Sequence, residues 1–251
     1  MNILGIGRFG FWHGGSLWIG HGMSATAMHA HHAIQLCFGI DGPIRLRDAP
    51  DGDWMAHHAM LIPSMTRHAL DARNALAAAL FCEPQSAIGR GLVARFGNGG
   101  LAALPEPARL AERISAIGQS MALGIGPEAA CQALLADVAG TDAPRPATDP
   151  RILKALEFVA AHLDATISLT AAASSVALSP SRLRHLFVAE VGIPFRSYVL
   201  WLRLQHALQT GLQGASWTQA AHQSGFIDSA HLSRTFRKMM GIAPTALPRR
   251  R

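Results

Sequence analysis

The chain has 251 residues, 49% of them hydrophobic and 15% charged, which allows two modest domains with a sizeable core and argues against wholesale disorder. It contains no run of about eighteen apolar residues, so no membrane-spanning helix is expected. The first twenty residues hold scattered glycines without a long apolar block, and we expect no secretory signal there. Three widely spaced cysteines, Cys37, Cys82 and Cys131, exclude a disulfide framework and a zinc ribbon and fit a reducing cytoplasm.

The net charge of +6 is distributed unevenly along the chain. Residues 1–150 carry 10 arginines and 12 acidic residues, a net charge of −2, whereas residues 151–251 carry 12 basic and 4 acidic residues, a net charge of +8. Eight of the thirteen histidines lie before residue 69. Such a basic half is typical of a module that binds a polyanion, joined here to a near-neutral module.

Residues 1–100 are rich in glycine, and their short apolar runs end at turn signals. The run at 34–40 is followed by Asp-Gly-Pro at 41–43, and the run at 44–46 is followed by Asp-Gly-Asp at 51–53. Short strands joined by tight turns are typical of an all-β sandwich or barrel. We therefore expect a β-barrel domain over residues 1–100.

The apolar period changes to that of helices in residues 101–140, which carry two stripes. The stripes are Leu110, Ile114, Ile117 and Met121, then Cys131, Leu134, Leu135 and Val138. These two amphipathic helices either cover one face of the barrel or form a dimerisation surface, and the sequence leaves both readings open. Residues 141–150 are polar, hold three prolines and are expected to be an inter-domain linker.

An internal repeat is the most informative feature of residues 151–251. Ser-Leu-Thr-Ala-Ala-Ala at 168–173 matches Ser-Trp-Thr-Gln-Ala-Ala at 216–221, which begins 48 residues later. Beyond a short turn the offset becomes 49, which pairs Phe187 with Phe236 and Gly192 with Gly241. One helical hairpin would be a weak signal, but two in tandem within a basic half are a strong one.

Each copy of the repeat has the pattern of a helix-turn-helix unit. Ser168 and Ser216 can cap an alanine-rich first helix, and Ser179 and Asp228 can cap a second helix with a basic outer face. A connecting helix over 195–210 would be about 24 Å long at about 1.5 Å per residue. The two second helices could then enter successive major grooves, which lie about 34 Å apart on one face of DNA.

The last hundred residues resemble the DNA-binding domain of the AraC/XylS-type bacterial transcription regulators. The residues that carry the resemblance are Gly-Phe at 225–226, Leu-Ser-Arg-Thr-Phe-Arg-Lys at 232–238 and Gly-Ile-Ala-Pro at 241–244. The chain departs from that family at Ala246-Leu247, where Tyr-Arg is usual, and at His185, where arginine is frequent. The resemblance implies a cytoplasmic DNA-binding protein without catalytic activity, whose partners are double-stranded DNA and RNA polymerase.

The repeat and the resemblance together assign the residues that contact DNA. In a recognition helix the outward positions near the N-terminus face base edges. Arg184 and Arg234 are expected to read guanine, because a guanidinium can bond O6 and N7 together. Arg237 and Lys238 are expected to bind phosphate, and Arg249–Arg251 to add affinity without specificity. The full set is Ser181, Arg182, Arg184, His185, Ser229, His231, Ser233, Arg234, Arg237 and Lys238.

Two segments in the histidine-rich part resemble the two motifs of the cupin barrel, a fold that also forms the sensor domain of many AraC-type regulators. The resemblance implies that His29, His31, Gln35 and His68 line an effector site. Three imidazoles, those of His29, His31 and His68, could bind a divalent transition metal with one position open. Gln35 stands where metal-binding cupins have glutamate, which favours an organic ligand held by hydrogen bonds. A purely structural role is a third alternative.

We therefore expect an α+β chain in four segments. Residues 1–100 form a cupin-like β-barrel that binds a small-molecule effector, and two following helices in 101–140 couple or dimerise, the dimer being placed on residues 104–140. A linker over 141–150 leads to an all-α DNA-binding domain of two helix-turn-helix units joined by a long helix, over 151–251. The expected function is ligand-responsive transcription regulation that requires no cofactor. The alternatives are a regulator without a ligand, a metal-sensing regulator and, least favoured, a cupin metalloenzyme.

Overall fold

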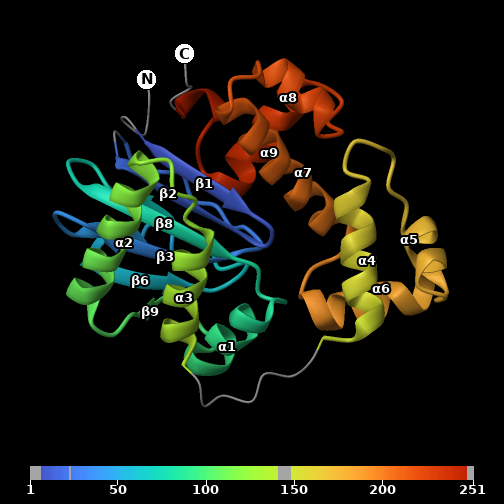
Figure 1. Cartoon of the computed structure of the whole chain (residues 1–251), viewed down its shortest axis with the longest axis horizontal. Coiled ribbons are helices and arrows are strands. Elements are labelled where there is room, and N and C mark those ends of the chain that lie inside the picture. The colour runs from blue at the N-terminus through green and yellow to red at the C-terminus, as the bar shows by residue number, and fades with distance from the viewer. Residues whose placement is uncertain (1–6, 23, 141–147, 248–251) are drawn as a thin grey trace. The chain divides into compact units, whose positions relative to one another are not determined.

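The computed structural model describes residues 7–22, 24–140 and 148–247 (Figure 1). The chain divides into two compact units, which are the described residues of 1–145 with 236–248 and those of 146–235. None of the described helices combines the length and apolar character needed to span a membrane. Residues 141–147 of the expected linker and the basic tail Arg249–Arg251 lie outside the described residues.

Two antiparallel sheets form the first unit, as the α+β prediction requires. The larger sheet has the strand order β1-β2-β8-β3-β6-β9, and the smaller sheet has the order β5-β4-β7. Strand β3 is central, since it pairs with β8 on one side and with β6 on the other. The strands are β1 Arg8–Trp12, β2 Gly15–His21, β3 Ile34–Gly39, β4 Ile44–Arg47, β5 Met55–His57, β6 Ala59–Ile62, β7 Ala69–Asp71, β8 Leu76–Cys82 and β9 Ala102–Ala103.

Strand β3 separates two apolar clusters because successive side chains of a strand point to opposite faces. Leu36 and Phe38 are fully buried in the cluster that the large sheet forms with helices. Cys37 lies in the second cluster, with Ile44 and Leu46 of the small sheet. By the same alternation Gln35 shares the face of Cys37, and its side-chain amide contacts the Cys37 Sγ at 2.9 Å. A buried polar face therefore lies on the side of β3 that looks toward the small sheet.

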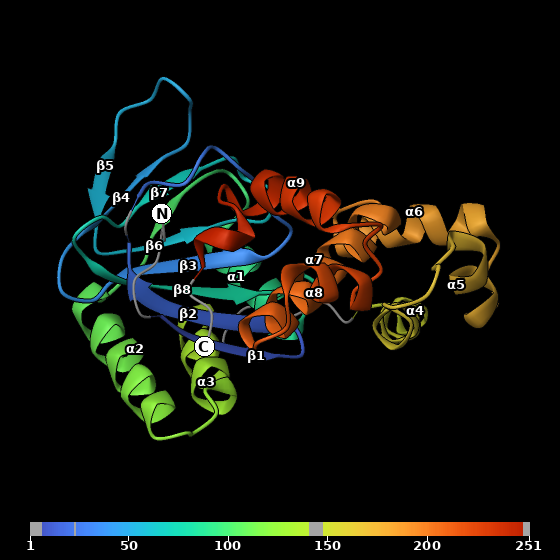
Figure 2. The same ribbon diagram turned by 90° about the horizontal axis from the view of Figure 1, so that it is seen from above.

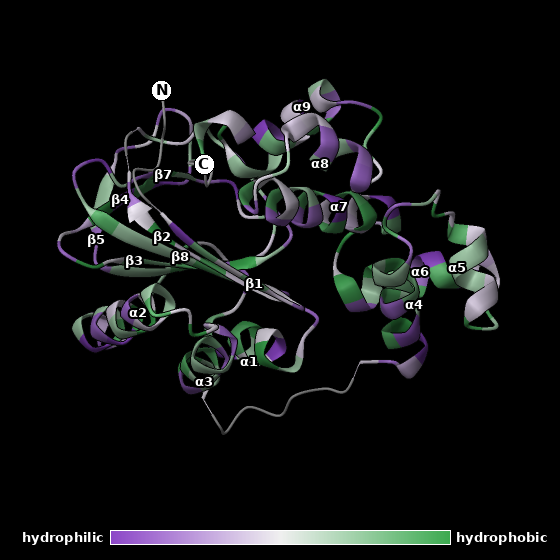
Figure 3. Ribbon diagram, turned by 45° about the horizontal axis from the view of Figure 1, so that its top comes forward, coloured by the Kyte–Doolittle hydropathy of each residue, from purple (hydrophilic) through white to green (hydrophobic). Residues whose placement is uncertain are grey.

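Helices α2 (Pro107–Ala122) and α3 (Glu128–Ala139) cover one face of the large sheet, and both carry hydrophobic and hydrophilic residues (Figures 1 and 3). Both predicted helices are thus confirmed. Their apolar stripes, including Leu110, Ile114 and Leu134, are buried in the cluster with the strands. The stripes therefore form core, and a dimer through these helices would have to use their outward faces. Helix α1 (Ala87–Phe96), which the sequence analysis did not predict, also packs here.

The helices from residue 150 onward follow the predicted repeat, and α7 runs between the two helical pairs (Figure 2). Three serines cap helices as predicted: the Oγ atoms of Ser168, Ser179 and Ser216 accept the backbone N–H three residues ahead at 3.0, 3.2 and 3.1 Å. Asp228 Oδ1 accepts the backbone N–H of His231 in the same way at 2.6 Å. The helices are α4 Pro150–Ala161, α5 Leu169–Ser175, α6 Pro180–Val191, α7 Phe195–Leu212, α8 Trp217–Gln223, α9 Ser229–Met240 and the 3-10 turn η1 Pro244–Ala246.

The turns inside the two helix-turn-helix units both contain a residue with positive φ, and exchanging glycine and alanine there should change stability in opposite directions. Gly225 has φ +72°, and a Cβ there would lie 2.7 Å from the Leu163 carbonyl oxygen and 2.8 Å from Arg203 Cζ. The preceding unit has Ala177 at φ +55° in its turn. Because the left-handed conformation costs a non-glycine residue about 1–2 kcal/mol, Gly225→Ala should lower the free energy of unfolding by at least that amount. Ala177→Gly should raise it by up to about 1 kcal/mol.

Urea unfolding of both variants beside the unaltered chain checks this pair of predictions. The two midpoints are expected to move in opposite directions. An unchanged midpoint for Gly225→Ala would show that the turn tolerates a Cβ and that the close approach of Leu163 does not restrict it.

Candidate nucleic-acid interface and histidine cluster

Helix α6 has one buried side and one outward basic side. Leu183 and Phe187 are fully buried, and the Phe187 ring lies edge-on to those of Phe195 and Tyr198 with centroid distances of 5.3 and 5.5 Å. This packing fixes the rotation of α6 on α7. All four predicted DNA-contacting residues of α6 are exposed: Ser181, Arg182, Arg184 and His185.

Helix α9 presents its basic residues to solvent in the same manner. Its long cationic side chains, Arg234, Arg237 and Lys238, are exposed. The predicted positions Ser229, His231 and Ser233 are only half-exposed. The His231 ring lies edge-on to Phe226 at a centroid distance of 5.2 Å, and its Nδ1 is buried. The structure thus places His231 partly in the turn of the second unit, whereas Arg234 faces outward.

The outward arginines of the two helices differ in their surroundings. Among the described residues no acidic side chain forms an ion pair with Arg184 or Arg234. The pKa of Asp149 is lowered to about 2, mainly by its hydrogen bonds with Arg151 and in smaller part by the charge of Arg182. Arg182 therefore has a carboxylate nearby, and the two uncompensated guanidinium groups are the ones best placed for an anionic partner.

Arg203 of α7 has a structural role. Its guanidinium donates hydrogen bonds to the carbonyl oxygens of Leu163 and Ala165 at 3.2 and 2.7 Å. Burial lowers the pKa of Arg203 from its usual value, which fits a side chain enclosed by the fold. This residue ties the end of α4 to α7 beside Gly225 and is not free to contact DNA.

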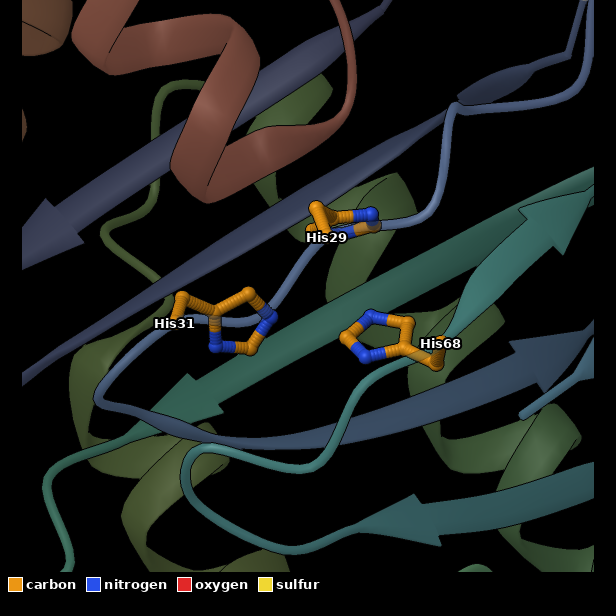
Figure 4. A group of neighbouring side chains, drawn as sticks. All are labelled: His29, His31 and His68. Atoms are coloured by element: carbon orange, nitrogen blue, oxygen red, sulfur yellow. The ribbon is translucent and has the colours of Figure 1, made fainter. Parts of the chain in front are cut away.

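Three histidines of the first unit lie together beside the small sheet (Figure 4). An antiparallel bridge joins the two segments that carry them, since His29 and His68 exchange backbone N–H···O bonds of 2.9 Å in both directions. The ring of His31 lies beside that of His29, with the two centroids 5.7 Å apart. The ring centroids of His29 and His68 are 4.1 Å apart, and those of His31 and His68 are 5.2 Å apart. One ring nitrogen from each histidine lies within 4.8 Å of the other two.

The backbone holds all three rings in one tautomer. The Nδ1 atoms of His29, His31 and His68 lie 2.8, 3.0 and 2.9 Å from backbone carbonyl oxygens, those of Ala27, Ala33 and Thr66. A carbonyl oxygen only accepts, so in the neutral ring the proton resides on Nδ1 and Nε2 offers a lone pair. The Nε2 of His68 is buried and has no hydrogen-bond partner among the described residues. His29 and His68 therefore present acceptor nitrogens, whereas His31 Nε2 faces the Gln35 Oε1 at 2.8 Å.

Burial also keeps these rings uncharged. Burial, followed by the charge of His31, lowers the pKa of His29 to about 4. Burial and then the charges of the two neighbouring histidines lower the pKa of His68 to about 2. The pKa of His31 is likewise lowered, chiefly by burial. At neutral pH the cluster is a set of neutral imidazoles, which is the form that binds metal ions.

A cavity of about 80 Å³ lies against the cluster, with Thr26, His29, Gln35, Leu70 and Phe81 among its lining residues. Pockets for drug-sized ligands are typically about 300–1,000 Å³. In this conformation the cavity therefore has room for a small ligand or an ion with its water, and a larger organic effector would require the domain to open.

The structure brings together all four predicted sensor residues. The side-chain amide of Gln35 lies 2.8 Å from His31 Nε2, so it contacts the cluster directly. His32, which the sequence did not single out, is also buried but points away, with Nε2 2.9 Å from Gln85 Oε1. The sequence did not single out Asp71 either. This buried carboxylate forms ion pairs with Arg73 and Arg45, and its pKa is lowered chiefly by the hydrogen bonds with Arg73. His32 lies in a bend just before β3, and its partner comes from 53 residues away.

Known proteins match the C-terminal part of the chain by sequence. A helix-turn-helix domain family matches residues 172–250. The arabinose operon regulatory protein of Escherichia coli strain K12 is 32% identical over 105 residues, which are 40% of this chain and 35% of that protein. The protein of that name from Salmonella typhimurium is also 32% identical over 105 residues. The match spans only about a third of the length of these curated relatives.

Solved structures extend the likeness to the whole fold. ToxT from Vibrio cholerae O395 superposes with a TM-score of 0.55 at 14% identity, covering 95% of this chain and 95% of that one. Wild-type ToxT with a bound unsaturated fatty acid gives a TM-score of 0.51 at 13% identity, covering 97% and 95%. At such identities the likeness concerns the fold alone. The C-terminal part of the chain is thus similar in sequence to a helix-turn-helix domain and to arabinose operon regulatory proteins, and the whole chain is similar in fold to ToxT.

Proposed function

We propose that the protein is a sequence-specific DNA-binding regulator of transcription that responds to an effector bound in its N-terminal unit. The observation that carries this proposal is the pair of capped helix-turn-helix units, each with an exposed arginine that lacks an acidic partner among the described residues, Arg184 and Arg234. Recognition helices of this type place such side chains against base edges in the major groove. The two helices would read successive grooves on one face of double-stranded DNA.

The effector site comprises His29, His31, Gln35 and His68, of which His29 and Gln35 line the small cavity. Buried polar groups of this kind orient a ligand, while the apolar lining favours its burial. The unsaturated fatty acid bound to ToxT supports the view that a protein of this fold can hold a small-molecule effector. Effector and DNA binding can influence one another only if the effector binds the active and inactive arrangements with different affinity.

We infer the oligomeric state and the other partners from the similarity to arabinose operon regulatory proteins. The protein acts in the cytoplasm as a homodimer, contacts RNA polymerase and catalyses no reaction. The dimer would use the outward sides of α2 and α3, where Glu112, Gln119 and Gln132 are exposed. A regulator of the same design without any ligand is the second candidate, and the small size of the cavity favours it over a large organic effector.

Selection of duplexes from a random DNA library by the full chain tests the DNA-binding proposal. We expect enrichment of sites with two short half-sites about one helical turn apart, because each recognition helix reads one groove. Fluorescence anisotropy should then give at least about a 1,000-fold preference for a selected site over a scrambled duplex of the same composition. Equal binding to both duplexes across a range of salt concentrations would contradict sequence-specific recognition.

A further inference from the structure

We propose that His29, His31 and His68 bind one divalent transition metal ion, such as Zn²⁺, and that this ion is the effector of the N-terminal unit. The effector role rests on the proposed function, whereas the metal site stands on its own geometry. Three imidazole nitrogens with an open fourth position form a common zinc coordination set, and imidazole also suits Ni²⁺ and Cu²⁺.

The first argument is the orientation of the donor atoms. Histidines that ligate metals almost always donate their second ring N–H to a backbone carbonyl or a carboxylate, which fixes the tautomer and turns the other nitrogen toward the ion. All three histidines have this arrangement, each through a carbonyl two residues away in sequence. A structural role would require only that buried nitrogens find partners, and it does not account for ring nitrogens of three histidines within 4.8 Å of one another.

The Nε2 of His68 is buried and has no hydrogen-bond partner among the described residues. A buried polar atom left without a partner is destabilising, and such atoms are rare in native proteins. A metal ion would satisfy this atom together with its two neighbours. The ring of His31 is held edge-on to Phe81 at a centroid distance of 5.4 Å, so the cluster is rigidly supported.

The ring nitrogens lie nearly close enough together to bind one ion, and a cavity lies beside them. Zinc–nitrogen bonds of about 2.0–2.1 Å in a tetrahedral site place two ligating nitrogens about 3.4 Å apart. The candidate nitrogens lie within 4.8 Å of one another, so side-chain rotations that close the gaps by about 1.4 Å at most would suffice. A water in liquid occupies about 30 Å³, and the cavity of about 80 Å³ can therefore hold one or two small ligands in the open position.

Gln35 regulates access to one donor. Its Oε1 lies 2.8 Å from His31 Nε2, and its Nε2 donates to Cys37 Sγ at 2.9 Å. With the Nδ1–H of neutral His31 donated to the Ala33 carbonyl, Nε2 and the Gln35 Oε1 would be two acceptors, so the contact is satisfied only when the amide turns its NH₂ group toward Nε2. An incoming ion would displace the amide from His31, and a small rotation of Gln35 toward Cys37 would allow this. Since Gln35 is neutral, the described donors bring no negative charge, and we expect the open position to accept hydroxide or a small anion.

Isothermal titration calorimetry with ZnCl₂ on the full chain, stripped of metal by a chelator, tests the site. We expect one ion per chain, and an affinity at least 100-fold weaker in both His29→Ala and His68→Ala. Two controls should bind zinc as the unaltered chain does. His58→Ala removes an exposed histidine of the same unit, and His32→Ala removes a buried histidine that faces Gln85.

Absorption of Co²⁺ by the unaltered chain is an independent measurement that needs no variant. Strong visible absorption, typical of a four-coordinate ion with nitrogen ligands, supports the site even if a cluster variant fails to fold by circular dichroism. A spectrum like that of hydrated Co²⁺ overturns it, and so does zinc affinity that is unchanged in both folded cluster variants.

The effector role is tested by anisotropy with a selected DNA duplex, with and without Zn²⁺. We expect zinc to change the DNA affinity of the unaltered chain at least fivefold and that of His68→Ala not at all. Stoichiometric zinc with unchanged DNA affinity overturns the effector role and leaves DNA recognition intact. Failure to bind any duplex in either state overturns the proposed function instead, and the calorimetry still decides the metal site.

Discussion

Substitution of Arg234 by alanine is expected to weaken binding to a selected DNA site by about 1–3 kcal/mol, up to about a hundredfold, and to relax the preference at one base pair. Arg234 is exposed on the outward side of α9, and no acidic side chain among the described residues neutralises it. A guanidinium that bonds guanine O6 and N7 together loses both bonds when truncated. Anisotropy titrations against duplexes with single base changes measure the effect.

Arg184→Ala should give a loss of the same size at a base pair in the other half-site. If α6 and α9 contact separate half-sites, as we propose, the double variant should lose the sum of the two free energies, about 2–6 kcal/mol. Such a loss would reduce the selected site to the affinity of unrelated DNA. A double variant that is no weaker than either single variant would contradict independent reading by the two helices.

Arg237→Ala is the matched control on the same helix as Arg234. Its side chain is also exposed but lies further along α9, where phosphate is the expected partner. The variant should weaken binding to all sequences alike and reduce the slope of log affinity against log salt concentration by about 1. Equal losses on every sequence for Arg234→Ala would instead assign Arg234 to the phosphates.

The helix-turn-helix units could be read from the sequence because their determinants are local. A hydroxyl or carboxylate at a cap acts on an N–H three residues ahead, and the repeat presents each signal twice. Ser168 and Ser216 cap as predicted for this reason, and Asp228 caps α9 as well. The amphipathic pattern likewise located α2 and α3, since a helix that covers a sheet must bury one stripe.

The sequence could not show which residues pack against the α2 and α3 stripes, Arg203 and His231. The stripes of α2 and α3 fit a dimer interface as well as a core, and only the fold shows the sheet that buries them. Arg203 belongs to the basic half by charge, yet its guanidinium is held by the Leu163 and Ala165 carbonyls, across 40 and 38 residues. His231 lies at an outward position of the repeat, and the nearby Phe226 ring holds it half-buried. In each case a long-range contact decides the role.

In the histidine cluster, local sequence identifies the residues but only the folded backbone shows how they meet. The resemblance to cupins named His29, His31 and His68 together, but the backbone bridge that joins their two segments is known only from the fold. The carbonyls that fix the ring tautomers can be identified only once the backbone is folded. The sequence therefore named the residues without deciding between metal, organic ligand and structure. The closeness of the three ring nitrogens and the unpartnered Nε2 of His68 among the described residues favour metal.

Gln35→Glu is expected to tighten zinc binding about 10–100-fold, because it places a carboxylate beside His31 where the chain has a neutral amide. The introduced carboxylate can ligate zinc directly or neutralise part of its charge. Without metal the same substitution should destabilise the N-terminal unit, since a carboxylate at a position only 4% exposed loses its hydration. The variant should thus unfold more easily than the unaltered chain in chelator and regain stability with zinc.

Thermal unfolding with and without ZnCl₂ measures both effects: the lower stability of Gln35→Glu without metal and its larger stabilisation by zinc. Ligand at about 100 times its dissociation constant stabilises the folded state by about 2.7 kcal/mol, and tighter binding increases this gain at the same zinc concentration. Gln35→Leu is the matched control, because it removes the amide without adding charge and should leave zinc affinity within about tenfold of the unaltered chain. Equal zinc affinity for Gln35→Glu and Gln35→Leu would mean that position 35 lies outside the reach of the ion.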